Sequence, residues 1–281
     1  MQIKKHIPNI ITCGNAVCGC LAIVKVNEGN LTWACYLVGI ALVLDFFDGF
    51  VARLLKVSSP IGKDLDSLAD MITFGVVPAM IMFKLIDFSY TLSLQKSLNN
   101  REAFTLAGVV IDFRNDNFIK YFAFIIAVFS AIRLAKFNND TRQTDSFIGL
   151  ATPANSMIVC GFCLVLKQLD LNLFDIESVI ENEQLFADNG NITGMVVMYL
   201  LNSPIALCLI SIGLSLLLVV ELPLFALKFK NFRWTDNKLR YIFLGICLIL
   251  MVSFKFVGIP LIIFLYILLS IVDNIFLKKK V

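Results

Sequence analysis

Apolar residues occur in long runs along this chain, and shorter polar segments separate the runs. The runs cover residues 10–26, 31–56, 63–86, 120–136, 150–168, 193–227, 240–254 and 257–276. Several of them approach or exceed the roughly 18 apolar residues that are typical of a membrane-spanning helix. The pattern therefore predicts an all-α, polytopic transmembrane helix bundle with about eight spans, with six or seven spans as alternatives.

The polar segments indicate where the bundle turns. Residues 26–30 predict a short turn, and Pro60 and Gly62 interrupt the chain before the third run. Longer polar connections are expected at residues 87–119, 139–149 and 169–192, the last of them acidic. The run at 193–227 is predicted to form a single long or kinked span.

The composition agrees with a membrane protein. Hydrophobic residues make up 58% of the chain and charged residues 16%, against about 45–50% and 25% in soluble domains. The net charge of +3, with no basic stripe among aromatic residues, excludes nucleic acid as a partner. Cys160 and Cys163 lie in an apolar run, and we interpret them as small buried residues. Lys4 and Lys5 precede the first run, but no clear cleavage site follows, so we expect a retained first helix.

Lysine and arginine gather on one side of the predicted topology. The residues assigned to that side are Lys4, Lys5, Arg53, Lys56, Lys63, Arg133, Lys136, Arg142, Lys228, Lys230, Arg233, Lys238, Arg240, Lys278, Lys279 and Lys280. The acidic connection at 169–192 falls on the other side. Basic loops stay in the cytoplasm, which predicts a multi-pass protein of the cell (cytoplasmic) membrane with both termini in the cytoplasm.

Four aspartates border the second and third apolar runs. Asp45 and Asp48 are three residues apart, and Asp66 and Asp70 are four apart. On helices both spacings place the pair on one face, and a short connection makes the two helices antiparallel neighbours. A charge at membrane depth costs roughly 2.5–3.5 kcal/mol. We therefore expect a divalent metal, Mg²⁺ or Mn²⁺, to neutralise the four carboxylates at the cytoplasmic boundary.

Small and basic residues accompany the aspartates. Gly49 and Ala52 permit close approach of a helix or ligand, and Arg53 offers a planar cation suited to phosphate. Gly62 opens the next helix, where bare backbone N–H groups can approach an anion. His6 is the only histidine and is remote, which excludes a Ser-His-Asp relay. The residues predict a site for a metal-bound diphosphate, where a carboxylate accepts the proton of an incoming hydroxyl.

The pattern Asp45-x2-Asp48-Gly49-x2-Ala52-Arg53-x8-Gly62-x3-Asp66-x3-Asp70 resembles, without departure, the motif of the CDP-alcohol phosphotransferase family. The resemblance implies a membrane enzyme that displaces CMP from a CDP-linked substrate with an alcohol, using divalent metal, and that forms a homodimer. It further implies that Asp45, Asp48 and Asp66 ligate the metal, and that Asp70 completes the site and acts as general base. It also implies that Gly49, Ala52 and Gly62 make room for the cytidine nucleotide, and that Arg53 binds phosphate.

Further stretches are similar to the phosphatidylserine synthase branch of this family. They lie at residues 7–19, 66–79, 133–138 and 147–154. Lys136 stands where that branch often has arginine, and Ala151 where it often has proline. The resemblance extends to about residue 155, which predicts a catalytic core at 1–155 and C-terminal transmembrane helices of the same bundle at 156–281. It implies transfer of a phosphatidyl group from CDP-diacylglycerol to the hydroxyl of L-serine, giving phosphatidylserine and CMP.

Two sets of residues have two interpretations each. Asn9, Thr12 and Asn15 are candidates to contact CDP-diacylglycerol; the alternative is helix capping and hydrogen bonding between helices. The candidates for binding serine are Arg133, Lys136 and Asn138, because arginine fits a carboxylate. The alternative for Arg133 and Asn138 is a boundary of basic residues at the membrane.

Two other functions stay open at this point. One is the same chemistry with another acceptor, glycerol 3-phosphate or inositol. The other is a membrane cation transporter that uses the aspartates as a transit site. Release of CMP distinguishes the enzyme from the transporter.

Overall fold

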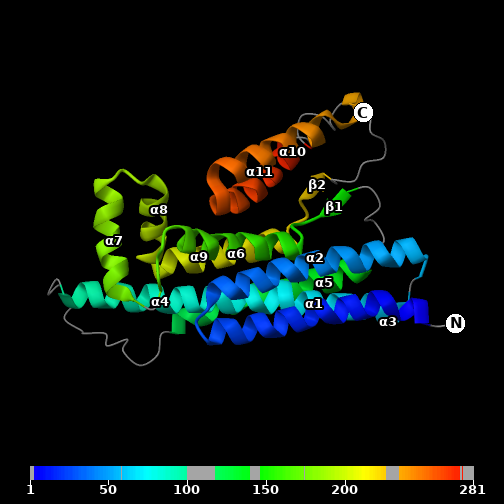
Figure 1. The fold of residues 1–281 in the computed structure, drawn as a ribbon, viewed down its shortest axis with the longest axis horizontal. Coiled ribbons are helices and arrows are strands. Elements are labelled where there is room, and N and C mark those ends of the chain that lie inside the picture. The colour runs from blue at the N-terminus through cyan, green and yellow to red at the C-terminus, as the bar shows by residue number, and fades with distance from the viewer. Residues whose placement is uncertain are drawn as a thin grey trace.

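The fold is that of a computed structural model, which describes residues 3–57, 59–99, 118–139, 146–173, 175–225, 234–272 and 274. The predicted all-α bundle is confirmed (Figure 1). The longer helices are α1 (Ile3–Asn27), α2 (Leu31–Leu55), α3 (Pro60–Asp70), α4 (Val77–Asn99), α5 (Ile125–Asn139), α6 (Thr152–Gln168), α7 (Ile176–Asp188), α8 (Ile192–Leu201), α9 (Pro204–Val219), α10 (Trp234–Phe254) and α11 (Gly258–Val272). The shorter elements are η1 (Met71–Val76), η2 (Phe118–Phe124), η3 (Lys255–Val257), β1 (Ser146–Ile148) and β2 (Pro223–Phe225).

The first two helices form the predicted hairpin. The tight turn between them uses Gly29, whose φ of 82° favours glycine. Asn30 caps α2, because its side chain accepts a hydrogen bond from the backbone N–H of Trp33 at 3.2 Å. This hairpin places the acidic end of α2 beside the N-terminal half of α1.

A continuous helical rod of α3, η1 and α4 runs through the bundle. Within its most apolar window 56% of the residues are buried, against 28% for α1 and for α2. The rod begins at Pro60 rather than near residue 63, because Ser59 caps it by accepting from the backbone N–H of Gly62 at 3.0 Å. The central position explains why its acidic residues lie close to side chains of α1 and α2.

The rod also continues beyond residue 86, where the sequence predicts a polar connection. Residues 87–99 are helical, while 100–117 lie outside the described residues. The polar side chains of this last part find partners on neighbouring elements. Asp87 pairs with Lys120 at 3.0 Å, and Lys96 pairs with Glu183 of α7. These tertiary contacts let polar residues extend the helix.

For the part of the chain that the structure describes, the number of candidate spans is below eight and reaches the predicted alternative of six at most. Five helical stretches are long and apolar enough to cross a membrane, or six if α8 and α9 count as one broken span. With 17 residues, α6 is shorter than the roughly 20 residues that a helix needs to cross the hydrocarbon core. The run predicted at 193–227 is divided by a bend of 94° between α8 and α9, where Ser203 caps α9 and Pro204 opens it.

The last apolar stretch folds back on itself. By length and hydropathy Arg240–Val272 counts as one stretch of 33 residues. Yet the rings of Phe243 and Tyr266 are 5.9 Å apart, whereas a straight helix would separate them by about 35 Å. The predicted division near residues 255–260 is therefore confirmed, with η3 as the turn between α10 and α11 (Figure 1).

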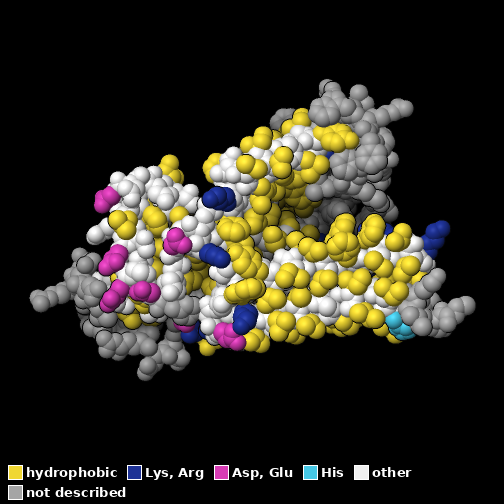
Figure 2. Space-filling model, viewed as in Figure 1, with side chains coloured by type: hydrophobic (Ala, Val, Ile, Leu, Met, Phe, Trp, Pro, Cys, Tyr) yellow, Lys and Arg dark blue, Asp and Glu magenta, His cyan; other side chains and the backbone are white. Residues whose placement is uncertain are grey.

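Two features of the connections are absent from the predictions. The acidic connection at 169–192 contains the helix α7, whose N-cap Asp175 accepts from the backbone N–H of Ser178 at 3.1 Å. Acidic side chains gather at this end of the face shown in Figure 2, whereas hydrophobic side chains cover the long helices. The strands β1 and β2 pair antiparallel, with Phe147 opposite Leu224. This pairing anchors the segment that leads to Leu150 and α6.

Candidate active site

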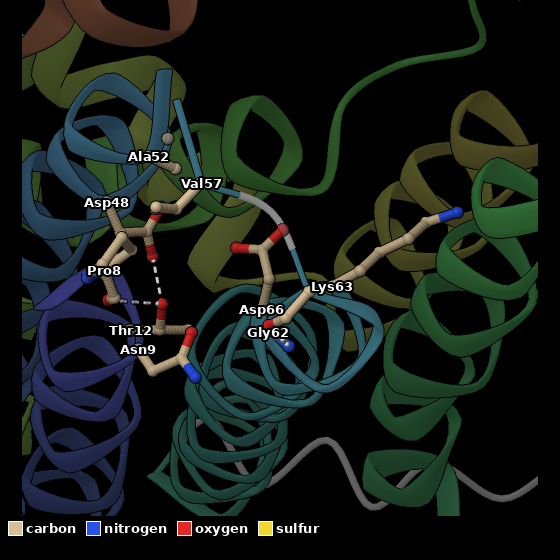
Figure 3. Close-up of a pocket in the computed structure, with 11 residues that line it drawn as sticks. Pro8, Asn9, Thr12, Asp48, Ala52, Val57, Gly62, Lys63 and Asp66 are labelled. Carbon is tan, nitrogen blue, oxygen red and sulfur yellow. Dashed lines mark hydrogen bonds between the residues drawn. The ribbon is translucent and has the colours of Figure 1, made fainter. Parts of the chain in front are cut away.

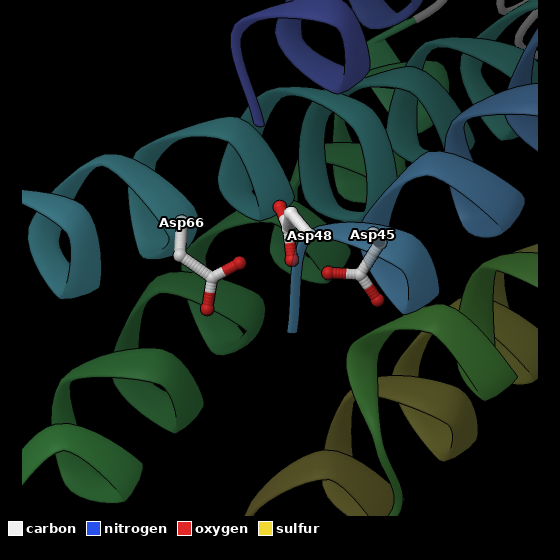
Figure 4. A group of neighbouring side chains, drawn as sticks. All are labelled: Asp45, Asp48 and Asp66. Atoms are coloured by element: carbon white, nitrogen blue, oxygen red, sulfur yellow. The ribbon is translucent and has the colours of Figure 1, made fainter. Parts of the chain in front are cut away.

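Three carboxylates from two helices form one acidic group. Asp45 and Asp48 lie on α2 and Asp66 on α3, and one oxygen from each lies within 4.8 Å of the others. Figure 4 shows Asp48 between the other two, with all three carboxylates turned toward a common space. Oxygen ligands at this spacing suit Mg²⁺ or Mn²⁺, which prefer carboxylates. The predicted neighbouring faces of the second and third helices are thus observed.

Asp70 lies beside this group and outside it. It ends α3, one turn after Asp66, and only 9% of its surface is exposed. Its Oδ1 accepts a hydrogen bond from Nδ2 of Asn15 at 3.3 Å, and its carboxyl is within hydrogen-bonding reach of Asp45. One carboxylate thus borders the acidic group without belonging to its closest three, an arrangement suited to a proton acceptor beside a metal.

The charge balance of the site calls for a cation. Among the basic side chains of the described residues, Arg133 alone is buried. It attracts Asp70 electrostatically, but one positive charge cannot neutralise four carboxylates. Burying unpaired charge is costly, so the donor set fits a divalent metal bound between Asp45, Asp48 and Asp66.

The first helix supplies polar partners to the carboxylates. The hydroxyl of Thr12 donates to Oδ2 of Asp48 at 2.7 Å and lies 3.0 Å from the carbonyl oxygen of Pro8. Asn15 donates to Asp70, as described above. For Thr12 and Asn15 the structure therefore shows hydrogen bonding between helices. Asn9 lies at the rim of the cavity described next.

A cavity of about 270 Å³ opens directly beside Asp48 and Asp66 (Figure 3). The side chains and backbone that line it are Pro8, Asn9, Thr12, Asp48, Gly49, Ala52, Val57, Ser59, Gly62, Lys63 and Asp66. The structure thus brings Asn9, Thr12, Gly49, Ala52 and Gly62 together, as the sequence predicts. A Cβ added to Gly49 would meet nothing within 4 Å, so the glycine leaves open space for a ligand.

Two basic residues near this end of the bundle differ in their relation to the cavity. Arg53 is exposed and does not line the cavity. Lys63 lines it, but its side chain extends toward α5 (Figure 3), where Nζ donates to the carbonyl oxygen of Asn138 at 2.7 Å. The role of Arg53 in binding phosphate stays a prediction.

The sequence predicts a bare backbone N–H at Gly62. In the structure this N–H donates to Ser59 Oγ at 3.0 Å. The helix begins two residues earlier, at Pro60. A Cβ on Gly62 would lie 2.9 Å from Oδ1 of Asn9. The glycine therefore serves close packing between α1 and α3 rather than anion binding through its own N–H.

The three residues predicted to bind serine occupy different environments. Arg133 is buried, donates from Nε to the carbonyl oxygen of Leu150 at 2.6 Å and stacks over Phe137. Asn138 donates from Nδ2 to Ser67 Oγ at 2.8 Å, which ties α5 to α3. Lys136 is exposed. Of the three, Arg133 is the one that interacts with Asp70.

Comparison with known proteins places the chain in a family. The model of the CDP-alcohol phosphatidyltransferase family matches residues 5–272. The chain belongs to this family. A Bacillus subtilis relative, CDP-diacylglycerol–serine O-phosphatidyltransferase, is 33% identical over 167 residues, which cover 59% of this chain and 77% of the relative.

More distant members of the CDP-alcohol phosphatidyltransferase family match over a similar length. A Helicobacter pylori protein with the same printed name is 32% identical over 161 residues, 57% of either chain. An archaetidylserine synthase of Methanothermobacter thermautotrophicus is 29% identical over 161 residues, 56% of this chain and 58% of the relative. This chain therefore spans less than two thirds of the length of these two relatives.

One structural feature of the candidate active site could not be predicted from the sequence. The helical rod changes to π-helical geometry at Met71, directly after Asp70, and such segments occur often at functional sites. Thr73 in this turn donates to the backbone oxygen of Asn15 at 3.2 Å. Gly19 permits the contact, because a Cβ there would lie 2.4 Å from Thr73 Oγ1. No local pattern signals the π turn, since it depends on packing between α1 and η1.

Proposed function

We propose that this protein transfers the phosphatidyl group of CDP-diacylglycerol to L-serine, giving phosphatidylserine and CMP. The observation that carries the proposal is the acidic group of Asp45, Asp48 and Asp66 beside both Asp70 and the cavity. A transporter needs carboxylates but has no need of a cavity built from small residues next to them. The printed names of the relatives support the reaction and the acceptor.

In this proposal the acidic group holds Mg²⁺ or Mn²⁺ through Asp45, Asp48 and Asp66, with Asp70 completing the site. A metal bound there would supply positive charge that offsets the charge of the diphosphate and of CMP. Asp70 accepts the proton of the serine hydroxyl while the serine oxygen bonds to the phosphorus that bears diacylglycerol. The bond from that phosphorus to the CMP oxygen breaks, so atoms and charge balance.

The cavity lined by α1, α2 and α3 receives the cytidine nucleotide. Gly49 and Ala52 leave room along α2, and Asn9 and Gly62 form the opposite wall. Arg53, at the exposed end of α2, meets a phosphate at the mouth of the cavity. The polar residues of α1, Asn9, Thr12 and Asn15, either contact CDP-diacylglycerol or position the carboxylates of the site.

Serine binds on the side of Asp70 that faces α5. Arg133 is buried there, and its guanidinium fits a carboxylate in planar geometry. Lys136 and Asn138 stay predictions for this subsite, as Asn138 already bonds to Ser67 and Lys136 is exposed. Glycerol 3-phosphate or inositol in place of serine would keep the same mechanism.

The setting of the reaction is part of the proposal. The site faces the cytoplasm, because Arg53, Lys56, Lys63 and Lys136 all lie at the same end of the bundle and are exposed. Both termini are cytoplasmic, and the protein is a homodimer of the cell membrane. The division into a core at 1–155 and C-terminal helices stays a prediction; residue 155 lies in α6.

The test is release of CMP from CDP-diacylglycerol by the detergent-purified protein. Serine, glycerol 3-phosphate and inositol are offered separately, with and without Mg²⁺ or Mn²⁺. Metal-dependent release with serine alone is expected. Asp70→Asn should abolish it, while Asp64→Asn, an exposed aspartate on the same helix, should retain it. Release with another alcohol would overturn the serine assignment, and no release with any acceptor would overturn the enzymatic function.

A further inference from the structure

Three polar side chains on α5 and α6, the helices that contact η1 after Asp70, are buried and have no hydrogen-bond partner among the described residues. Ser130 on α5 and Thr152 and Asn155 on α6 have no exposed surface. Their hydroxyl groups, and both polar atoms of the Asn155 amide, lack a partner among the described residues. Buried polar groups in native proteins are paired with protein, water or ligand in the great majority of cases. Four unpaired atoms on three side chains therefore call for an occupant.

The position of these side chains relates them to Asp70. Ser130 packs against η1, where a Cβ on Gly75 would lie 3.1 Å from the Cβ of Ser130, and η1 begins directly after Asp70. Arg133 lies one turn beyond Ser130 on α5 and bonds to the carbonyl oxygen of Leu150. Because α6 begins two residues after Leu150, Thr152 and Asn155 occupy its first turn. Both α5 and α6 contact η1.

This polar group lies apart from the nucleotide cavity. The cavity is lined by α1, α2, α3 and the connection between the last two, whereas Ser130, Thr152 and Asn155 belong to α5 and α6. Asp70 interacts with side chains of three helices, since it accepts a hydrogen bond from Asn15 of α1, lies beside Asp45 of α2 and attracts Arg133 of α5 electrostatically. Two substrates can thus reach Asp70 from different helices.

The chemistry of the unpaired atoms restricts the occupant. Asn155 offers two N–H donors and a carbonyl acceptor, and each hydroxyl can donate or accept. With the cation of Arg133 nearby, the set matches a small molecule that carries both an anionic group and hydrogen-bond donors. An apolar occupant would leave every one of these groups unpaired, which is costly.

We infer that Asn155, Thr152 and Ser130 form the acceptor subsite and determine which alcohol is used. This inference rests on the proposed function. Asn155 and Thr152 bind the ammonium and hydroxyl groups of the amino acid, Arg133 binds its carboxylate, and Ser130 closes the subsite against η1. CDP-diacylglycerol does not contact these residues.

The test compares Asn155→Leu, in which leucine has nearly the same shape as asparagine, with the wild-type protein. The KM for serine should rise about tenfold, as expected for loss of hydrogen bonds worth one decade in affinity. The KM for CDP-diacylglycerol should stay within about twofold of the wild-type value, because loss of acceptor contacts alone changes acceptor binding. Serine should raise the melting temperature of the wild type, and this shift should be lost in Asn155→Leu. The thermal shift does not depend on turnover.

Matched variants separate binding from structure. Ser89→Ala removes another fully buried, unpartnered hydroxyl, on α4, and should leave both KM values unchanged. If Asn155→Leu does not fold, Thr152→Val and Thr152→Ser test the inference instead. Thr152→Val should raise the KM for serine, and Thr152→Ser, which keeps the hydroxyl, should not. Unchanged KM values in Asn155→Leu and Thr152→Val would overturn the inference and leave water as the occupant. A fall in kcat and melting temperature with both KM values unaltered would also overturn the inference.

The failure of this inference differs from failure of the proposed function. A wild-type protein that releases no CMP contradicts the function before any variant is considered. A wild type that uses glycerol 3-phosphate or inositol, with a KM for that alcohol raised in Asn155→Leu, keeps the subsite and rejects serine. An active wild type with serine and an unaffected Asn155→Leu rejects the subsite alone.

Discussion

The hydroxyl of Thr12 in α1 lies 2.7 Å from Oδ2 of Asp48 in α2. Both side chains are buried, with 3% and 7% of their surface exposed. The bond orients a carboxylate that also faces Asp45 and Asp66. The N-terminal helix is therefore part of the candidate metal site, although it contributes no carboxylate.

Replacing Thr12 with valine should weaken metal binding. Valine keeps the shape but removes the donor that orients Asp48, and loss of such a partner lowers metal affinity about 10–100-fold. The concentration of Mn²⁺ that gives half-maximal CMP release should rise by at least about tenfold. Thr12→Ser, which keeps the hydroxyl, should stay near the wild type. Equal metal dependence in the valine and serine variants would contradict the orienting role of the hydroxyl.

Replacing Gly49 with alanine should stabilise the fold and impair the reaction. Glycine within a helix costs about 0.5–1 kcal/mol relative to alanine, and a methyl group at residue 49 meets no protein atom within 4 Å. The same methyl group enters the cavity beside Asp48. We expect a higher melting temperature together with a several-fold rise in the KM for CDP-diacylglycerol.

The matched control for this prediction is Gly39→Ala. Gly39 lies on the same helix, also has no atom within 4 Å of an added Cβ, and does not line the cavity. It should show the gain in stability without the change in KM. If both alanine variants kept the wild-type KM, the cavity would not be the nucleotide site.

Local spacing is the reason why the acidic group could be predicted from the sequence. Asp45 and Asp48 share a face of α2 because they are three residues apart, and a short connection returns the chain to bring Asp66 opposite them. Gly49, Ala52 and Gly62 line the cavity for the same reason. Helical periodicity and one hairpin suffice for these residues.

Long-range packing is the reason why other parts could not be predicted. The π turn after Asp70 depends on α1, α5 and α6, which pack against it. Leu150 reaches Arg133 because β1 pairs with β2, whose partner residues are 75–79 positions away (Ser146–Phe225 and Ile148–Pro223 at the ends). The unpaired atoms of Ser130, Thr152 and Asn155 are recognised only once burial is known. Hydropathy detects none of these contacts.

Removing metal should lower the melting temperature of the wild type much more than that of Asp66→Asn. Without metal the close carboxylates repel one another, so Asp66→Asn should melt at a higher temperature than the wild type in EDTA. Added Mn²⁺ should raise the melting temperature of the wild type, because a bound ligand stabilises the folded state, and should raise that of Asp66→Asn much less.

Asp64→Asn provides the control, since Asp64 lies on α3 and is exposed. Its melting temperature should match that of the wild type both in EDTA and with Mn²⁺. An equal Mn²⁺ shift in the wild type and in Asp66→Asn would exclude Asp66 as a ligand. CMP release by the wild type should cease in EDTA and return with excess Mn²⁺.

The far end of α4 should affect stability without affecting the reaction. Lys96 pairs with Glu183 of α7, and Asn202, which ends α8, donates to Glu183 at 3.0 Å and accepts from Lys96 at 2.8 Å. Lys96 is 26 residues beyond Asp70 along one helical rod, or roughly 40 Å. Glu183→Ala removes the acceptor of both partners but leaves a partly exposed site, so we expect a loss of about 1 kcal/mol at most, or roughly 2 °C in melting temperature. The loss should shrink at high salt, which screens the ion pair, and both KM values should be unchanged. The control is Glu181→Ala, since Glu181 is on the same helix and exposed; this variant should alter neither the melting temperature nor the KM values. A change in the KM for serine in Glu183→Ala would mean that α7 affects the site at the other end of the rod.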